Sequence, residues 1–200
     1  MDEAHSLGVL GQSGRGISES AGVHPGDVDI LMGTLSKTLA SCGGYIAGSA
    51  ALIEYLRYTC PGFVFSVGMP PASAAAALAA LVVLREEPSR VEQLRTRSAR
   101  FRTRARAAML DIGDEALTAI VPVVVGSSER AIQLTWALRT RGIHVQPMVE
   151  PAVPEHAARL RFFLSWEHSD SQIDDAVNAV AELLHSEHGV VHHAKRAAKR

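Results

Sequence analysis

Hydrophobic and polar positions follow two different periods along this chain, and the two periods predict separate strands and helices. Short apolar runs of the kind that form buried strands occupy residues 28–33, 45–48, 63–67, 120–125, 143–148 and 160–165. Helical periodicity covers residues 50–58, 72–85, 89–110, 127–141 and 169–185. Ser49 and Ser127 stand where helix-capping residues are expected, and Gly142 stands where the fourth helix should end. The pattern therefore predicts an α/β protein.

The predicted elements fall into two units joined by a helix rich in arginine. Residues 1–84 hold three short predicted strands behind a glycine- and serine-rich loop, which are too few strands for a free-standing sheet. Residues 85–110 are expected to form the connecting helix, and residues 111–186 a small α+β domain. Residues 187–200 form a basic tail that we expect to be disordered.

Composition narrows the class of protein. Hydrophobic residues make up 47% of the 200 residues and charged residues 20%, which are typical of a globular protein with a core. The formal net charge is −1, so we expect no general affinity for nucleic acid or for an anionic membrane. The arginines between residues 85 and 106 are expected to form a solvated helix face, because glutamates at 86, 87 and 92 offset part of their charge.

Three further features of the sequence argue against a membrane span, a secreted protein and a metal site. Residues 58–84 carry no charge, but prolines and glycines interrupt them and their second half is mostly alanine, so they predict a strand and a buried helix instead of a membrane span. The polar first residues do not resemble a secretory leader, and two cysteines are too few for a disulfide framework, so we expect a cytoplasmic protein. His185, His188 and His192 have helix-like spacing, but Gly189 interrupts them and we expect no metal site.

Lys37 is the only lysine before residue 195, and it follows the first predicted strand in a stretch of small residues, 33–44. A lysine in a partly desolvated pocket can lose its proton and form an imine with an aldehyde. The neighbouring hydroxyl groups and glycine amides suit a phosphate group. The alternative interpretation is a surface lysine in a glycine-rich turn.

Several short motifs occur in a fixed order around Lys37. They are Asp2-Glu3-Ala4-His5-Ser6, Gly14-Arg15-Gly16, Ser36-Lys37, Gly43-Gly44-Tyr45, Ser66-x-x-Met69-Pro70-Pro71, Val145-Gln146-Pro147, Pro151-x-Val153-Pro154, Ala158-Arg159-Leu160-Arg161 and Glu167-His168. As a set they resemble the pyridoxal-phosphate (PLP) enzymes of fold type I, and most closely the α-oxoamine synthases. The resemblance implies part of a fold type I large domain followed by the small C-terminal domain, and therefore the C-terminal half of such an enzyme.

The resemblance also implies roles for single residues. Lys37 would form the Schiff base with PLP and later remove a proton from the substrate. Asp2 would pair with the pyridine nitrogen, where a carboxylate keeps the ring protonated and electron-accepting. His5 would contact the phenolic oxygen of the cofactor, Thr34 its phosphate, and Ser66 would also contact the cofactor.

Arg161 best matches the arginine that holds the carboxylate of the amino-acid substrate in this family. Its planar guanidinium suits two-point recognition of a carboxylate. Alternation along residues 160–164 predicts that Arg161 and Phe163 lie on one face of the strand, opposite the face of Leu160, Phe162 and Leu164.

The activity implied by the resemblance is condensation of an amino acid with an acyl thioester, on CoA or a carrier protein, with loss of carbon dioxide. A homodimer, or a partner that supplies the N-terminal half, is implied as well. Two alternatives stay open: an aminotransferase of the same fold, and a non-catalytic fragment or partner subunit.

Overall fold

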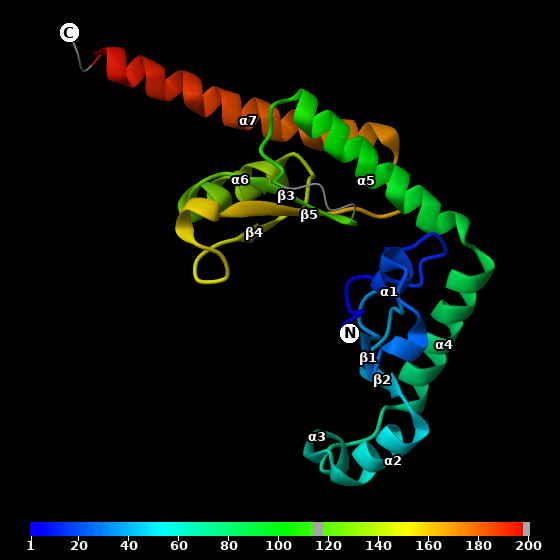
Figure 1. The fold of residues 1–200 in the computed structure, drawn as a ribbon. Helices are drawn as coiled ribbons and strands as arrows, with labels where there is room; N and C mark the ends of the chain where they lie inside the picture. The colour runs from blue at the N-terminus through cyan, green and yellow to red at the C-terminus, as the bar shows by residue number, and fades with distance from the viewer. Residues whose placement is uncertain (114–117, 198–200) are drawn as a thin grey trace. The chain divides into compact units, whose positions relative to one another are not determined.

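The computed structural model describes residues 1–113 and 118–197, with side chains as far as residue 186. The chain divides into two compact units, Met1–Gln93 and Leu94–Arg200 (Figure 1). Each unit carries its own small antiparallel sheet, β1–β2 in the first and β3–β5–β4 in the second. The mixed α/β architecture predicted from the sequence is confirmed.

In unit 1, β1 (Ile30–Thr34) lies between two extended segments. On one side it pairs antiparallel with β2 (Gly44–Gly48), with Met32 opposite Ile46. On the other side it meets the first three residues in a parallel bridge, in which the amide of Met32 donates to the carbonyl of Met1 (2.9 Å) and the amide of Glu3 donates to the carbonyl of Met32 (2.7 Å). Because side chains alternate along strands, Asp2, Met32 and Ile46 share one face.

The opposite face of this sheet is covered. Here Tyr45 reaches across Gly33, and any side chain at position 33 would overlap the tyrosine ring. A small core forms on this side around Leu35, Leu39 and Ala77. The first face stays open, since Met32 is 40% exposed and Ile46 is 49% exposed.

The helices of unit 1 are short except for the last one. They are α1 (Ile17–Ala21), η1 (Pro25–Asp27), α2 (Ala50–Thr59), α3 (Pro61–Val64) and α4 (Pro71–Glu86). The predicted cap of α2 is confirmed, because the hydroxyl of Ser49 accepts a hydrogen bond from the amide of Leu52 (3.3 Å).

The strand predicted at residues 63–67 is wrong. Pro61 occupies the first turn of α3, where its fixed φ favours a helix, and the chain then turns at Phe65 and Ser66. In the described part of unit 1, no strand pairs with this segment. Its apolar side chains therefore remain on the surface, with Phe65 88% and Val67 97% exposed.

Unit 2 is a three-stranded sheet with helices packed on one face. Its elements are α5 (Ser89–Ala107, which begins in unit 1), β3 (Ile120–Val124), α6 (Ser128–Thr140), β4 (Gln146–Met148), η2 (Glu155–Ala157), β5 (Arg159–Phe163) and α7 (Asp170–Ala197). In β5, Leu160 and Phe162 point into the core while Arg161 and Phe163 point away, which confirms the predicted alternation.

The arginine-rich helix α5 belongs to the core of unit 2. Phe101 is 1% exposed, and its ring centroid lies 4.9 Å from that of Phe162. The sequence predicted a small domain that begins at residue 111, whereas this packing places the division between Gln93 and Leu94.

The expected solvated arginine face of α5 is only partly present. Arg100 and Arg104 pair with Asp174 on α7, at 2.7 Å and 3.3 Å. Arg102 is 3% exposed and donates to the carbonyl of Ile120 (3.1 Å). Much of the positive charge of this helix therefore serves packing within unit 2.

Helix α7 continues to Ala197, past the predicted end at residue 185 and into the segment expected to be a disordered tail. Alanine, lysine and arginine in this segment favour a helix. The last three residues of the predicted tail, 198–200, lie outside the described residues. None of the described helices combines the length and the hydropathy needed to cross a membrane.

Candidate functional site

Asp2 and Thr34 lie on the open face of the unit 1 sheet. Asp2 stands opposite Met32 in the parallel bridge, and Thr34 follows Met32 by two positions along β1. Two positions along a strand place side chains on the same face about 7 Å apart. The carboxylate of Asp2 is exposed and accepts a hydrogen bond from the amide of Ala4 (2.7 Å), which orients it.

Two hydroxyl groups meet at the end of β1. The side-chain oxygens of Thr34 and Ser36 lie 2.8 Å apart, and the amide of Ser36 donates to the Thr34 oxygen (3.2 Å). Gly44, the partner of Thr34 on β2, has no side chain to cover them. This end of the sheet therefore offers hydroxyl groups and free space beside a carboxylate.

Lys37 stands on a turn that is fixed at both ends. The amide of Leu35 donates to the carbonyl of Gly43 (3.0 Å), and the amide of Ser41 donates to the carbonyl of Leu35 (2.8 Å). Leu35 and Leu39 are buried beneath the turn. The side chain of Lys37 is exposed, and within the described residues no hydrogen bond or ion pair engages its ammonium group. The Lys37 side chain therefore extends without a polar partner among the described residues from a turn that two backbone hydrogen bonds hold.

The turn of Lys37 is joined to the segment that carries His5. The hydroxyl of Thr38 donates to the carbonyl of Leu7 (2.7 Å), and the Thr38 methyl group fills the space that a side chain at Gly8 would need. His5 is exposed on the turn before Leu7. The structure therefore brings the Asp2–His5 segment, Thr34 and the Lys37 turn together at one end of unit 1.

Two predicted site residues lie outside this cluster. Ser66 follows α3, where its hydroxyl donates to the carbonyl of Phe63 (3.3 Å), and among the described residues nothing links it to Asp2, Thr34 or Lys37. Arg161 belongs to unit 2, where its guanidinium lies over the ring of Phe163 at 5.0 Å from the centroid.

Glu3 is a residue of this region that the sequence analysis did not single out. It is 2% exposed, and its carboxylate accepts hydrogen bonds from Ser6 and from residues 17 and 18. Burial alone would raise the pKa of Glu3, but hydrogen bonds from Ser18 and Ser6 outweigh it and hold the pKa below its usual 4.5. Burial also raises the pKa of the Tyr45 hydroxyl, and the charge of Glu3 adds to this effect.

An apolar groove of about 670 Å³ adjoins Thr34 between the sheet and helices α2 and α3. Its lining includes Met32, Tyr45, Leu56 and Phe63. In the part of the chain that the structure describes, no three side chains of histidine, cysteine, aspartate or glutamate gather as a metal site would require.

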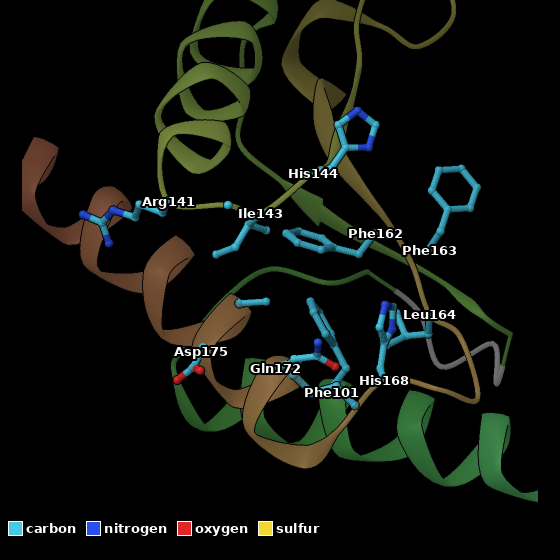
Figure 2. A pocket seen from close by; sticks show the side chains of 13 residues that line it. Phe101, Arg141, Ile143, His144, Phe162, Phe163, Leu164, His168, Gln172 and Asp175 are labelled. Carbon is cyan, nitrogen blue, oxygen red and sulfur yellow. The ribbon is translucent and has the colours of Figure 1, made fainter.

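Unit 2 holds a separate cavity of about 460 Å³ with Phe101 and Phe162 in its wall (Figure 2). Two of its polar side chains accept hydrogen bonds from backbone amides between β5 and α7. The ring nitrogen Nδ1 of His168 accepts from the amide of Ser165 (3.0 Å), and Gln172 accepts from the amide of Ser169 (2.9 Å). Arg161 is not among the residues that line this cavity.

Comparison with known proteins identifies the family. Residues 1–180 match the family described as aminotransferase class I and II. The chain belongs to this family. The named relatives are of the group of enzymes that the motifs around Lys37 indicated.

One curated relative is the 8-amino-7-oxononanoate synthase of Anaeromyxobacter dehalogenans, which is 44% identical over 92% of this chain and 46% of its own length. Among solved structures, the serine palmitoyltransferase of Sphingomonas wittichii is 32% identical with a TM-score of 0.86, over 94% of this chain and 47% of that one. A lysine-to-alanine variant of the serine palmitoyltransferase from S. paucimobilis, solved with a bound PLP–myriocin aldimine, is 28% identical with a TM-score of 0.85, over 94% and 47% of the two chains.

These likenesses confirm the fold. The structure resembles the PLP-dependent transferases of fold type I, and in particular the α-oxoamine synthases, as the motifs predicted. The chain spans about half the length of the curated relatives it matches.

Proposed function

We propose that this chain is the part of a PLP-dependent acyltransferase that carries the cofactor lysine. The enzyme would join an amino acid to an acyl thioester with loss of carbon dioxide. The observation that supports this most directly is the placement of Asp2, Thr34 and the free amine of Lys37 at one open end of the unit 1 sheet. The relatives named above are acyltransferases of this kind.

The groups at this end of the sheet fit PLP by their chemistry. PLP presents an aldehyde, a basic ring nitrogen and a phosphate. The amine of Lys37 suits the aldehyde, the carboxylate of Asp2 suits the protonated nitrogen, and the hydroxyl of Thr34 suits the phosphate. Gly44 leaves the space beside Thr34 uncovered.

When bound, PLP supplies an electron sink that stabilises negative charge on the substrate carbon. The protein's own groups would carry the proton and the charges around it. The Nζ of Lys37 would accept the proton from the substrate, because no partner among the described residues engages its side chain and two backbone hydrogen bonds hold the turn beneath it. Asp2 would hold the proton on the ring nitrogen, and His5 would donate a hydrogen bond to the cofactor. Ser66 is proposed to contact the cofactor as well, although it lies outside this cluster and its hydroxyl donates to the carbonyl of Phe63.

The remaining parts of the proposal concern substrate and partners. Arg161 would hold the carboxylate of the amino acid with its planar guanidinium. The acyl group would arrive on CoA or on a carrier protein. We propose a cytoplasmic homodimer; the free thiols of Cys42 and Cys60 suit a reducing compartment.

The open face of unit 1 favours one further candidate, a subunit that acts with another chain. Ile30, Met32 and Ile46 form an uncovered apolar surface on the same face as Asp2. A second polypeptide that covers this surface would complete the site without any change in the roles of Lys37 and Asp2.

The test is reductive trapping. The full chain is incubated with PLP, reduced with borohydride and digested, and the adduct is located by mass spectrometry. We expect the adduct on Lys37, while Lys195 and Lys199 report nonspecific labelling. A Lys37→Arg variant should lose the specific adduct. Equal labelling of all three lysines would contradict the proposal.

A second measurement separates acyl transfer from amino transfer. An amino acid labelled at its carboxyl carbon is supplied with an acyl thioester. An acyltransferase releases labelled carbon dioxide only when both substrates are present, whereas an aminotransferase passes the amino group to the cofactor without the thioester. Thioester-independent amino transfer would favour the aminotransferase alternative.

A further inference from the structure

Glu3 accepts hydrogen bonds from four groups at once, and all four belong to residues 6, 17 and 18. Its carboxylate receives the hydroxyl groups of Ser6 and Ser18, the latter at 2.5 Å. It also receives the amide of Ile17 at 2.7 Å and the amide of Ser18 at 3.0 Å. A buried carboxylate with this many donors is fixed in place, since each lost bond would leave a polar group unsatisfied.

The Glu3 carboxylate occupies space that a glycine leaves free. Gly16 has φ 103°, in the region that favours glycine, and a side chain there would overlap the Glu3 carboxylate. Three glycines of this loop each leave room for a neighbouring side chain. Gly8 gives room to Thr38, Gly11 to Glu19, and Gly16 to Glu3.

The backbone of Glu3 is bound to β1 while its side chain is bound to the start of α1. Its amide donates to the carbonyl of Met32 (2.7 Å), next to the point where Asp2 bridges Met32. Because neighbouring side chains of an extended segment point to opposite faces, fixing Glu3 below the sheet fixes Asp2 above it.

We propose that Glu3 is a positioning residue, which holds Asp2 and the following turn of His5 in register with the Lys37 end of β1. The functional consequence of this inference rests on the proposed function, because the residues that Glu3 positions are those assigned to PLP. Its structural content is independent of the cofactor: removing the charge should release residues 1–3 from β1.

The chain offers a matched control in Glu19. This carboxylate binds the same glycine loop, through the hydroxyl of Ser13 (2.7 Å) and the amide of Arg15 (3.0 Å). As with Glu3, hydrogen bonds lower the pKa of Glu19. Among the described residues, the Glu19 carboxylate accepts its hydrogen bonds from Ser13 and Arg15 and none from residues 1–5, so Glu19→Gln changes the loop without removing a bond to the segment of Asp2.

The cofactor-free test is amide hydrogen exchange of the full chain. The Met32 amide, which donates to the carbonyl of Met1, reports whether the first residues stay on β1. We expect Glu3→Gln to speed exchange at Met32 at least tenfold, with the Leu35 amide changed less than twofold. Glu19→Gln should leave Met32 within twofold of the wild type. Unchanged protection of Met32 in Glu3→Gln, or an equal effect of Glu19→Gln, would overturn the inference.

The second test uses bound PLP. If Glu3 orients Asp2, then Glu3→Gln should shift the pH midpoint of the visible PLP absorbance, while Glu19→Gln should leave it in place. An unshifted midpoint in Glu3→Gln would overturn the inference. If the wild-type chain forms no adduct at Lys37, the proposed function fails, and the exchange at Met32 still decides the role of Glu3.

Discussion

The hydroxyl of Thr38 donates a hydrogen bond to the carbonyl of Leu7, and this contact joins the turn of Lys37 to the segment of Asp2 and His5. Thirty-one positions separate the two residues in the chain. The bond is partly buried, so its loss would leave the Leu7 carbonyl without this donor in a place with limited access to water.

Thr38→Val keeps the shape of the side chain and removes the donor. We expect a loss of about 1 kcal/mol in the free energy of unfolding, measured by urea denaturation. Thr38→Ser keeps the donor and should recover most of this loss. Unchanged stability of Thr38→Val, with a loss only in Thr38→Ser, would assign the effect to the methyl group beside Gly8 instead of to the hydrogen bond.

Replacing Arg161 tests the proposed carboxylate site. Arg161→Lys keeps the charge and loses the planar two-point geometry, so the affinity for the amino acid should fall by about 1.5–3 kcal/mol while PLP loading is unchanged. The measurement is a titration of the PLP-loaded protein with the amino acid, followed by absorbance. Arg159 is the control, because its Nε is engaged by the carbonyl of Ala157 (2.8 Å). A loss confined to Arg159→Lys would move the role to Arg159.

Unit 2 should fold on its own only when α5 is included. A chain of residues 94–186 keeps Phe101 against Phe162 and should unfold cooperatively, as followed by circular dichroism. A chain of residues 111–186 lacks that contact and should lose stable structure. In the longer chain, Phe101→Ala should cost roughly 3–5 kcal/mol. A cooperative transition in the 111–186 chain would contradict the role given to α5.

Acid should remove the contribution of Glu3 to stability. Its pKa is lowered in the folded protein, so the contribution is complete above the usual value of 4.5 and disappears as pH falls through the lower folded value. The difference in unfolding free energy between wild type and Glu3→Gln should therefore be large near pH about 6 and shrink below about pH 4. A difference that stays constant over this range would show that Glu3 acts through packing alone.

The exposed apolar residues after α3 should cause self-association of the full chain. Phe65 and Val67 are 88% and 97% exposed. Replacing both by serine should shift sedimentation toward smaller species. Trp136→Ser, which removes a 61% exposed aromatic side chain from unit 2, serves as the control and should have little effect. A monodisperse wild-type monomer would contradict this prediction.

Features that depend on neighbours in the chain could be predicted from the sequence. The Ser49 cap and the alternation around Arg161 are local, and both are confirmed. The segment 63–67 could not be assigned correctly, because an apolar run becomes a strand only where another strand pairs with it. The motifs around Lys37 indicated the family, which the comparisons confirm.

The sequence patterns could not predict contacts between distant parts of the chain. Helical periodicity puts Phe101 on the apolar face of its helix, but it does not reveal that Phe162 is the residue that covers this face. Glu3 was missed for a related reason. Its partners Ile17 and Ser18 approach it only because the glycine loop folds back, and nothing in the local pattern reveals the path of that loop.

The ring of Tyr45 across Gly33 has a consequence for how this family of sequences can change. Gly33 has no left-handed φ, so the tyrosine ring is what excludes a larger residue at position 33. A side chain at 33 becomes acceptable once position 45 becomes small, and the two positions should therefore vary together in related chains. Gly33→Ala alone should lower the stability of the fold, and Tyr45→Ala added to it should restore part of that stability. The two positions should therefore change together in evolution.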